Sequence, residues 1–595
     1  MAGIDANLDV SDNSDSDEFY DAFCDLEDQN FSCENDMDLK TSLQDAERAI
    51  DYFFNNQFED ARNLLHPFAH KSLYHSMGNA VFAFLEAVLT FEDIERASTE
   101  LKKCLELCQM LRKRSTLTES IGNTFKRKNF NHFTDLECHA ELCMAEALLM
   151  NALLTFIEDE NLSSLIRGSL KVRQCYNSFR VCEQIMKHRI WESQDDSETT
   201  NLKMHFNSGV HMGIGTFNLM ISLLPGRIVK ILQFIGFTAN KTAGLNMLLT
   251  GHRENGLRQV LCSLTLLGYH LMVASMISDR NRNVQLCDDI LATQLAKYPK
   301  GLWFLFFKGR LELIKGNLVE SELWYQKSLR SQQIWPQFHL LSFWELLWLN
   351  SLLGKWSEAE LYATYLLQKS KWSRTIYAYQ LAAVKITADK AKRKSGYDSQ
   401  PDPSIDALMH EVPAFKQRIA GKSLPMEKFM IKRAERYGCQ NGNLVLPLIE
   451  LMYLWNLFKF FSRNCNIADD ILRMIDMELA SLPQSQSDSL YSADNRALCL
   501  LLRGSCYRQM AMPALALQDL EECIAIGQSG SGLKEDLFLI PYAHFEAALC
   551  HEKSKAAAML QNVKKKFSGF ALESRLHFRI HAALMDISEP NYGSP

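Results

Sequence analysis

The sequence is poor in the two residues that most often interrupt helices. Glycine accounts for 27 of 595 residues and proline for 14, and both are below the averages of roughly 7% and 5% in proteins. Few tight turns or strand breaks are therefore encoded. Long stretches of Ala, Leu, Glu, Lys, Gln and Met, which are strong helix formers, fill the chain instead. We predict an all-α fold.

No two of the 16 cysteines form a Cys-x-x-Cys pair, and the first residues are acidic rather than basic and then apolar. A secretory signal and a disulfide framework are therefore not expected. We expect a cytoplasmic protein whose cysteines pack as small apolar side chains. The nucleus is an alternative, because the basic clusters Arg112–Arg114 and Lys126–Lys128 have the spacing of a two-part import signal, although a solvated basic loop is the simpler interpretation.

Basic residues are missing from the first 39 positions, which contain thirteen Asp or Glu. Such a segment cannot bury enough apolar surface to offset its ordering entropy, so residues 1–39 are predicted to form a disordered acidic tail. The remaining chain has 58 acidic and 64 basic residues, a net charge of +6. That charge is too dilute to form a nucleic-acid-binding surface, and no nucleic acid partner is expected.

Apolar residues recur at helical spacing in pairs of runs, as in Thr41–Phe68, where Asn55–Gln57 separates the two runs. Neither helix of such a hairpin can bury its apolar stripe alone, so hairpins stack on one another. The pairs repeat at roughly 34 to 40 residues, which is typical of a tetratricopeptide-type α-solenoid. Further units are Met77–Met110, Thr134–Phe156, Leu302–Leu329, Leu341–Leu367, Ala497–Ile526 and Tyr542–Phe567.

A tetratricopeptide hairpin has a small residue midway along its first helix, an aromatic residue three positions further on, and small residues at the turn and along its second helix. Only small side chains let neighbouring helices pack tightly where they cross. The residues that match this pattern are Gly309, Gly316, Ser321, Tyr325 and Ser328 in one unit, Gly504, Tyr507, Ala511, Ala516 and Cys523 in a second, and Ala49, Tyr52, Asn56 and Ala61 in a third.

The middle of the chain departs from the repeats, with Gly209–Gly215 (GVHMGIG), Thr216–Arg227 and an 18-residue apolar run, Val260–Ile277. Together with the ending Phe567–Leu584 (FSGFALESRLHFRIHAAL), this region resembles the tetratricopeptide repeat protein 39 / inclusion-body clearance family. The resemblance covers essentially everything after the acidic tail. It implies a helical-repeat protein without an assigned enzyme activity. It also implies links to sterol and lipid handling, turnover of regulatory proteins and clearance of aggregated protein.

No motif assembles a nucleophile, a base and an orienting group, so we predict that the protein is not an enzyme and has no catalytic residues and no cofactor. Two pairs, His577 with His581 and Cys104 with Cys108, share a helix face at i,i+4 but lack further ligands, so no metal site is expected. The run Val260–Ile277 is just long enough to cross a membrane, but its Ser, Thr and His residues favour a buried helix.

The preferred function is a non-enzymatic scaffold or adaptor that binds partner proteins in the concave groove of the solenoid. The alternative is a protein that binds lipid, or docks at the periphery of an organelle membrane, through the apolar central segment. Tryptophan and arginine dominate binding hot spots, although the tryptophans are equally expected in the core between repeats. The predicted groove residues are Trp303, Phe306, Arg310, Trp344, Trp348, Ser505, Arg508 and Gln509.

These patterns divide the chain into five predicted parts. They are the acidic tail (1–39), the N-terminal helical repeats (40–190), the apolar, glycine-containing central helical segment (206–280), the central tetratricopeptide-like repeats (281–386) and the C-terminal helical repeats (404–587).

Overall fold

The computed structural model describes most of the chain after the acidic segment. The described residues are 37–90, 93–112, 130–158, 162–191, 197–223, 240–277, 283–370, 372–394, 402–416, 424–482, 490–528 and 532–588. Two predictions fall outside them, namely the disordered tail up to residue 36 and the basic clusters beyond Arg112.

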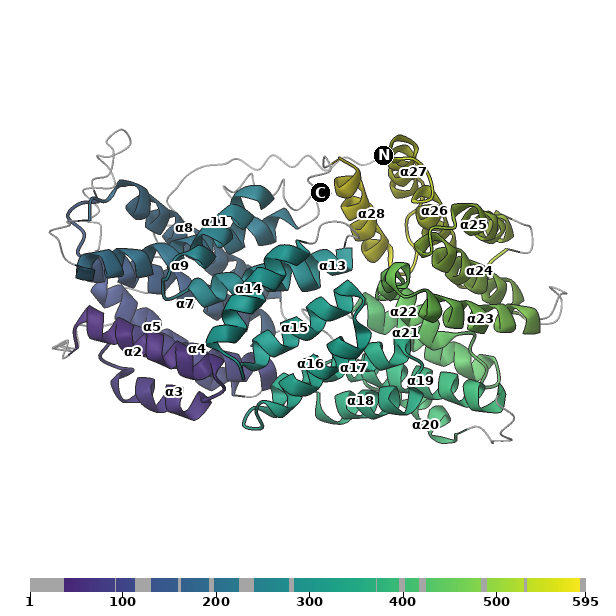
Figure 1. Cartoon of the computed structure of the whole chain (residues 1–595), viewed down its shortest axis with the longest axis horizontal. Coiled ribbons are helices and arrows are strands. Elements are labelled where there is room, and N and C mark those ends of the chain that lie inside the picture. The colour runs from purple at the N-terminus through teal and green to yellow at the C-terminus, as the bar shows by residue number, and fades with distance from the viewer. Residues whose placement is uncertain are drawn as a thin grey trace.

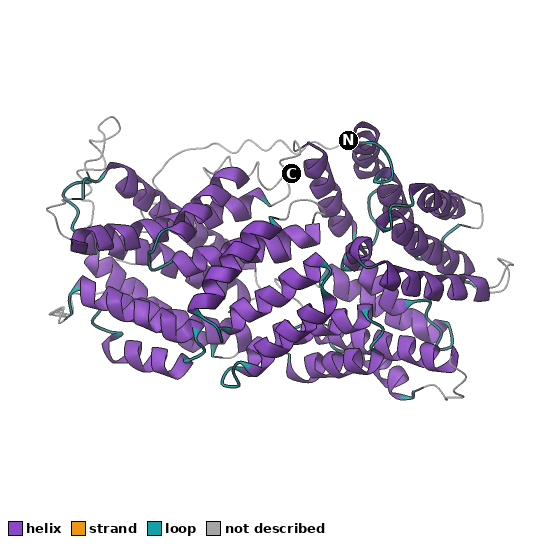
Figure 2. Cartoon of the chain, in the orientation of Figure 1, coloured by secondary structure: helices purple, strands orange, loops and turns teal. Residues whose placement is uncertain are grey.

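Helices, and no strand, make up the regular structure of the described residues (Figure 2). This confirms the predicted all-α fold. The helices of the first half are α2 (Leu39–Phe54), α3 (Phe58–Leu65), η1 (His66–Phe68), α4 (Leu73–Thr90), α5 (Ile94–Leu111), α7 (Asp135–Glu158), α8 (Leu162–His188), α9 (Ser197–Ser222), α11 (Lys241–Arg253), α12 (Gln259–Leu267), η2 (Gly268–Val273), α13 (Ala274–Ile277) and α14 (Val284–Lys297).

The second half continues as a succession of helical hairpins. Its helices are α15 (Leu302–Lys315), α16 (Leu318–Arg330), η3 (Pro336–Phe338), α17 (His339–Leu352), α18 (Trp356–Lys369), α19 (Arg374–Lys394), α20 (Ser404–Glu411), α21 (Pro425–Cys439), α22 (Pro447–Leu454), η4 (Leu457–Arg463), α23 (Cys465–Ser481), α24 (Ser492–Gln509), α25 (Pro513–Gln528), α26 (Leu539–Ala548), α27 (Lys553–Lys566) and α28 (Glu573–Ser588).

The hairpin of α15 and α16 shows why small residues recur in the repeats. Helix α15 ends at Gly316, whose φ of 91° is readily adopted only by glycine. A Cβ atom on Gly309 would lie 2.8 Å from the Tyr325 ring, so the two helices touch at this glycine. The Ser321 hydroxyl donates a hydrogen bond to the Gly309 carbonyl at 2.8 Å. The predicted tetratricopeptide packing is thus confirmed for this unit.

The helices follow one another along an elongated molecule, from α2–α9 at one end through α14–α18 to α23–α27 at the other (Figure 1). The last helix, α28, leaves this order, because it contacts both α27 and α13 in the middle of the molecule. The N-terminal hairpin is tied to the middle as well. The Tyr298 hydroxyl donates to Asp51 at 2.7 Å, and the Leu302 N–H donates to the Asn56 side chain at 3.2 Å.

The apolar run of the central segment is a buried helix. Helices α12, η2 and α13 are continuous, and the run buries Val260, Leu266 and Leu271. Helices α9 and α11 pack closely, since a Cβ atom on Gly244 would lie 2.8 Å from the Gly215 carbonyl oxygen. Within the described residues, no helix combines the length and the apolar character that crossing a membrane requires. Residues 224–239 of this segment lie outside the described residues.

Candidate partner-binding site

Four aromatic side chains from three separate helical regions meet near the middle of the molecule. Helix α17 places Trp344 and Trp348 one turn apart, with ring centroids 5.7 Å from each other. Trp455 follows α22 and lies 5.7 Å from Trp344 and 6.4 Å from Trp348, while Tyr377 of α19 lies 6.1 Å from Trp344. We call Trp344, Trp348, Tyr377 and Trp455 the aromatic cluster.

Local backbone geometry fixes the position of Trp455. Pro447 begins α22 at a position where its missing N–H costs nothing, and the Trp455 N–H closes the helix on the Leu451 carbonyl at 2.8 Å. Asn456 then adopts a left-handed φ of 59°, which turns the chain into η4. Asparagine tolerates that conformation better than most residues.

The aromatic cluster is partly open to solvent. Trp348 is buried, with 3% of its surface exposed, whereas Trp344, Tyr377 and Trp455 are half-buried. The indole Nε1 atoms of Trp348 and Trp455 are buried and have no acceptor among the described residues. Buried indole N–H groups usually find an acceptor. The cluster therefore combines exposed aromatic surface with unused hydrogen-bond donors.

Helix α28 adds a cation to the aromatic cluster. The guanidinium carbon of Arg575 lies 4.5 Å from the centroid of the Trp455 ring, and its Nε donates to the Leu454 carbonyl at 2.8 Å. Burial, together with the nearby Arg579, lowers the pKa of Arg575 to about 10, but the side chain stays charged at neutral pH. A cation–π contact of this kind stabilises by about 0.5–1 kcal/mol at exposed sites.

One turn further along α28, the charge of Arg579 is neutralised within the protein. The guanidinium of Arg579 pairs with Glu546 at 3.0 Å, and Arg508 of α24 pairs with the same carboxylate at 2.6 Å. The Tyr453 hydroxyl also donates to Glu546. Burial raises the pKa of Glu546, but Arg508 and Arg579 outweigh it, so the net shift of this pKa is downward. This buried network attaches α28 to α24 and α26.

The structure brings together only some of the predicted groove residues. Trp344 and Trp348 both belong to the aromatic cluster. Arg508 does not contact the cluster directly: it pairs with Glu546, which also pairs with Arg579 of α28. Trp303 lies elsewhere, edge-on to Phe338 at 5.0 Å. Four of the predicted residues are buried, and burial favours the packing interpretation for them. Partner binding by the predicted set stays a prediction; the buried members are Phe306, Arg310, Trp348 and Ser505, and the half-buried members are Trp303, Trp344, Arg508 and Gln509.

Arg310 shows most clearly what burial changes. Its guanidinium pairs with Glu345 of α17 at 2.6 Å and donates to the Leu271 carbonyl at 3.1 Å and the Ser275 hydroxyl at 3.2 Å. Only 4% of its surface is exposed. Arg310 thus fastens the repeats to the central segment. The sequence predicted that Arg310 faces an open groove. Helical spacing shows which residues share a helix face, but it does not show whether other helices cover that face.

Three members of the site were not predicted from the sequence. Tyr377, Trp455 and Arg575 belong to segments far apart in the chain, and no local pattern links them. Trp455 follows the apolar run Leu444–Leu454, and Arg575 precedes Arg579 by one helical turn, but both features are common in buried helices. Their meeting depends on α28 returning to the middle of the molecule.

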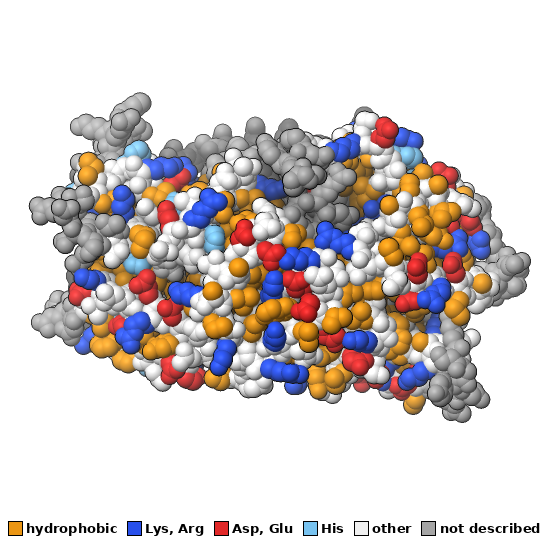
Figure 3. All heavy atoms as spheres, viewed as in Figure 1, with side chains coloured by type: hydrophobic (Ala, Val, Ile, Leu, Met, Phe, Trp, Pro, Cys, Tyr) orange, Lys and Arg blue, Asp and Glu red, His pale blue; other side chains and the backbone are white. Residues whose placement is uncertain are grey.

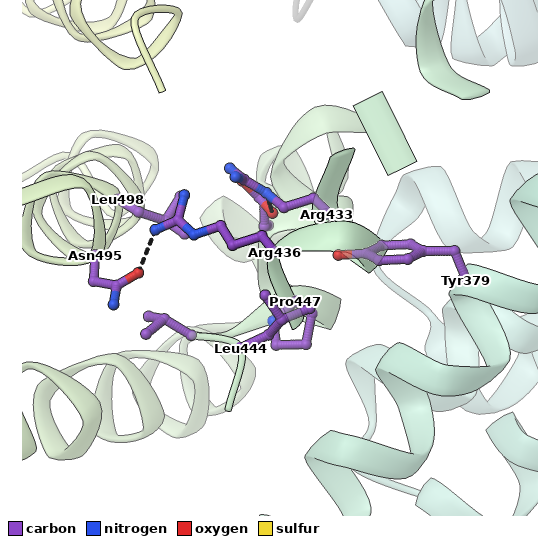
Figure 4. A pocket seen from close by; sticks show the side chains of 9 residues that line it. Tyr379, Arg433, Arg436, Leu444, Pro447, Asn495 and Leu498 are labelled. Atoms are coloured by element: carbon purple, nitrogen blue, oxygen red, sulfur yellow. Dashed lines mark hydrogen bonds and ion pairs between the residues drawn. The ribbon is translucent and has the colours of Figure 1, made fainter. Parts of the chain in front are cut away.

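A second cluster of buried charges lies between α19, α21 and α24 (Figure 4). Arg433 makes two hydrogen bonds to Glu450, at 2.9 and 2.6 Å, and pairs with Asp536 at 2.7 Å. Arg436 donates to Asn495 at 2.6 Å. The cavity beside these groups measures about 10 Å³, which is roughly the room that one water molecule needs. These charges hold the helices together.

The paired Cys residues are part of the packing, whereas the paired His residues are half-buried. Cys104 and Cys108 are buried in α5, and His577 lies 3.9 Å from Glu573 on α28. Among the described residues, no three His, Cys, Asp or Glu side chains are grouped so that they could hold a metal ion.

Comparison with known proteins gives a consistent result. The family model described as Iml2/Tetratricopeptide repeat protein 39 matches residues 47–510. The chain is 32% identical over 562 residues to tetratricopeptide repeat protein ttc-39B of Caenorhabditis elegans, which covers 92% of this chain and 93% of that protein. The four residues of the aromatic cluster lie within the matched range of the family model, and Arg575 lies beyond it.

Proposed function

Because the chain belongs to the Iml2/Tetratricopeptide repeat protein 39 family, we propose that it is a helical-repeat scaffold that binds partner proteins through the aromatic cluster. One observation carries the proposal. Three half-buried aromatic residues and a cation, namely Trp344, Tyr377, Trp455 and Arg575, lie together on rigid helices. Tryptophan, tyrosine and arginine are the residue types that dominate binding hot spots.

A binding role also agrees with the state of the thiols. Burial raises the pKa of Cys262, Cys287 and Cys523 to about 12. Because the thiolate is the reactive form, these cysteines are poor nucleophiles at neutral pH. The proposal is for a protein that acts by bringing other proteins together. The family resemblance implies lipid and sterol handling, protein turnover and clearance of inclusions. In this proposal the protein serves such processes by binding partner proteins.

Lipid binding by the central segment is the alternative function. In the described part of that segment, a Cβ atom on Gly213 would collide with the Phe179 ring at 2.0 Å, and one on Gly251 would lie 2.7 Å from the Cys262 sulfur. These glycines permit close contact between helices, which accounts for the glycine pattern without a lipid cavity. The observations on described residues therefore favour the scaffold.

Site-specific photo-crosslinking in cells tests the proposal. The probe p-benzoylphenylalanine replaces Tyr377 in the full chain, and a matched control carries it at Leu361 of α18, which is 44% exposed. We expect a defined set of proteins to be crosslinked from position 377 and not from position 361. Equal sets from both positions, or none from 377, would overturn the proposed function.

A further inference from the structure

Arg575 is a cation that the described residues do not neutralise. Its pKa is lowered by burial and Arg579, and no carboxylate is among the groups that influence it. It stands in the first turn of α28, where the helix dipole disfavours positive charge. Apart from the Leu454 carbonyl, its nitrogens have no hydrogen-bond partner among the described residues. Other buried arginines differ, since Arg310 and Arg579 each pair with a glutamate.

The surroundings of Arg575 indicate the chemistry of a ligand. Arg575 is half-buried, so part of its side chain reaches solvent. A guanidinium with free terminal nitrogens matches a carboxylate, which it can bind with two parallel hydrogen bonds. Beside it, Trp344, Tyr377 and Trp455 expose aromatic surface. An acidic residue next to an aromatic residue in a peptide would satisfy both parts of the surface.

The chain itself contains such a peptide. Residues 12–28 include eight Asp or Glu and three aromatic residues, Phe19, Tyr20 and Phe23, and no Lys or Arg occurs before Lys40. In Glu18–Asp21, two aromatic residues stand between two acidic residues. On the face of the molecule shown in Figure 3, acidic and basic side chains are intermixed. A single-sign segment of this composition is the plainest charge complement to Arg575 in the sequence.

The segment is long enough to reach the site. A fully extended chain spans at most about 3.3–3.6 Å per residue, so the chain from Glu18 to Leu39 can span about 70 Å. The route through the protein from Leu39 to Arg575 follows α2, the chain from Tyr298 into α15 and a few side-chain contacts, on the order of 70 Å in all. The straight line between the two ends is shorter than this route. The contacts on that route join Asp51 to Tyr298, Arg310 to Ser275, Ser275 to Lys459, and Trp455 to Arg575.

We propose that the aromatic cluster and Arg575 form a docking surface for residues 12–28 of the same chain. The inference rests on the proposed function, because the acidic segment would compete with a partner for one surface. Covalent attachment makes this docking intramolecular, so it does not depend on the protein concentration. The segment would be held by contacts to one arginine and three aromatic side chains, and the charged part of these contacts should weaken with added salt.

The test uses the purified full chain with p-benzoylphenylalanine in place of Tyr377. Trypsin leaves residues 1–40 as one peptide, because they contain no earlier Lys or Arg. We expect mass spectrometry to find this peptide crosslinked to position 377, and not to the control probe at Leu361. In the 377-probe chain, Arg575→Gln should lower the crosslink yield at least fivefold. Arg473→Gln, which removes an exposed cation on α23, should change it less than twofold.

Several outcomes would overturn the docking surface. They are the absence of the 1–40 peptide from the crosslinks at 377, an equal yield from 361, and an equal loss with Arg473→Gln. A crosslink that joins isotope-labelled and unlabelled chains would show docking between two copies and would also overturn it. Should Arg575→Gln unfold the protein, Arg575→Lys and a titration with NaCl replace it. Partner crosslinks in cells without the 1–40 crosslink in the purified chain would refute this inference and leave the proposed function standing.

Discussion

Arg575 and Trp455 are 120 positions apart, yet the guanidinium carbon of Arg575 lies 4.5 Å from the centre of the Trp455 ring. The contact joins the last helix to the end of α22, and through Trp455 to the tryptophans of α17. It places a charged group beside partly exposed aromatic surface in the middle of a stack of repeats. The predictions below separate the residues that hold this arrangement from those that are free to bind.

Trp348 and Trp344 should differ in their contribution to stability. Trp348 is 3% exposed and Trp344 is half-buried. Trp348→Ala should lower the free energy of unfolding by about 3–5 kcal/mol through cavity formation, and Trp344→Ala should lower it by clearly less. Urea unfolding followed by circular dichroism measures both. Equal losses for the two variants would show that Trp344 is also a core residue.

Arg310 should be required for folding rather than for binding alone. Arg310→Ala leaves Glu345 buried without its cation, and breaking a buried pair in this way costs about 3–5 kcal/mol. Arg473→Ala, which removes an exposed arginine of α23, is the matched control and should stay within about 0.5 kcal/mol of the wild type. A nearly neutral Arg310→Ala would place this side chain in an open groove after all.

Two glycines should respond in opposite ways to the same change. At Gly309 an added Cβ atom meets the Tyr325 ring at 2.8 Å, so Gly309→Ala should destabilise the protein by about 1–3 kcal/mol through overpacking. At Gly438 in α21 nothing lies within 4 Å of an added Cβ atom, so Gly438→Ala should stabilise the helix by up to about 1 kcal/mol. Thermal melts of the two variants should shift in opposite directions. Shifts in the same direction would contradict the close packing at Gly309.

Buried histidines should make the protein less stable in mild acid. Burial, together with the charges of Arg258 and His205, lowers the pKa of His139 to about 3, and burial also lowers the pKa of His205 to about 4. In the unfolded chain both histidines protonate near the ordinary histidine pKa of 6.5. The unfolded state then binds more protons than the folded state, so stability falls as pH drops from about 6.5 toward 4.

Each of these histidines contributes a slope of about 1.4 kcal/mol per pH unit in that window. Unfolding free energies at pH 7, 6 and 5 measure the slope, and His139→Gln should reduce it by the share of one group. A slope that the His139→Gln variant leaves unchanged would show that His139 is protonated in the folded protein. The hydrogen bonds of its ring with the Tyr74 hydroxyl and the Leu202 carbonyl argue for a single buried position.

The sequence could predict what depends on local spacing. Low glycine and proline content indicated helices, and Gly309 with Tyr325 marked a helix crossing that the structure confirms. The i,i+4 spacing of Trp344 and Trp348 placed them on one helix face. The sequence could not show which elements would cover that face. Glu345 pairs with the buried Arg310, and Arg575 places a positive charge beside the aromatic cluster. Both contacts form only in the tertiary structure.

The central claim is that the aromatic cluster binds a partner protein. Its most direct test is the affinity of a partner identified by crosslinking at position 377, measured with the purified wild type and with Trp344→Ala. We predict that Trp344→Ala weakens binding about thirtyfold, which corresponds to about 2 kcal/mol, under conditions where unfolding assays show the variant fully folded. An unchanged affinity, or a loss that appears only where the variant unfolds, would contradict the claim.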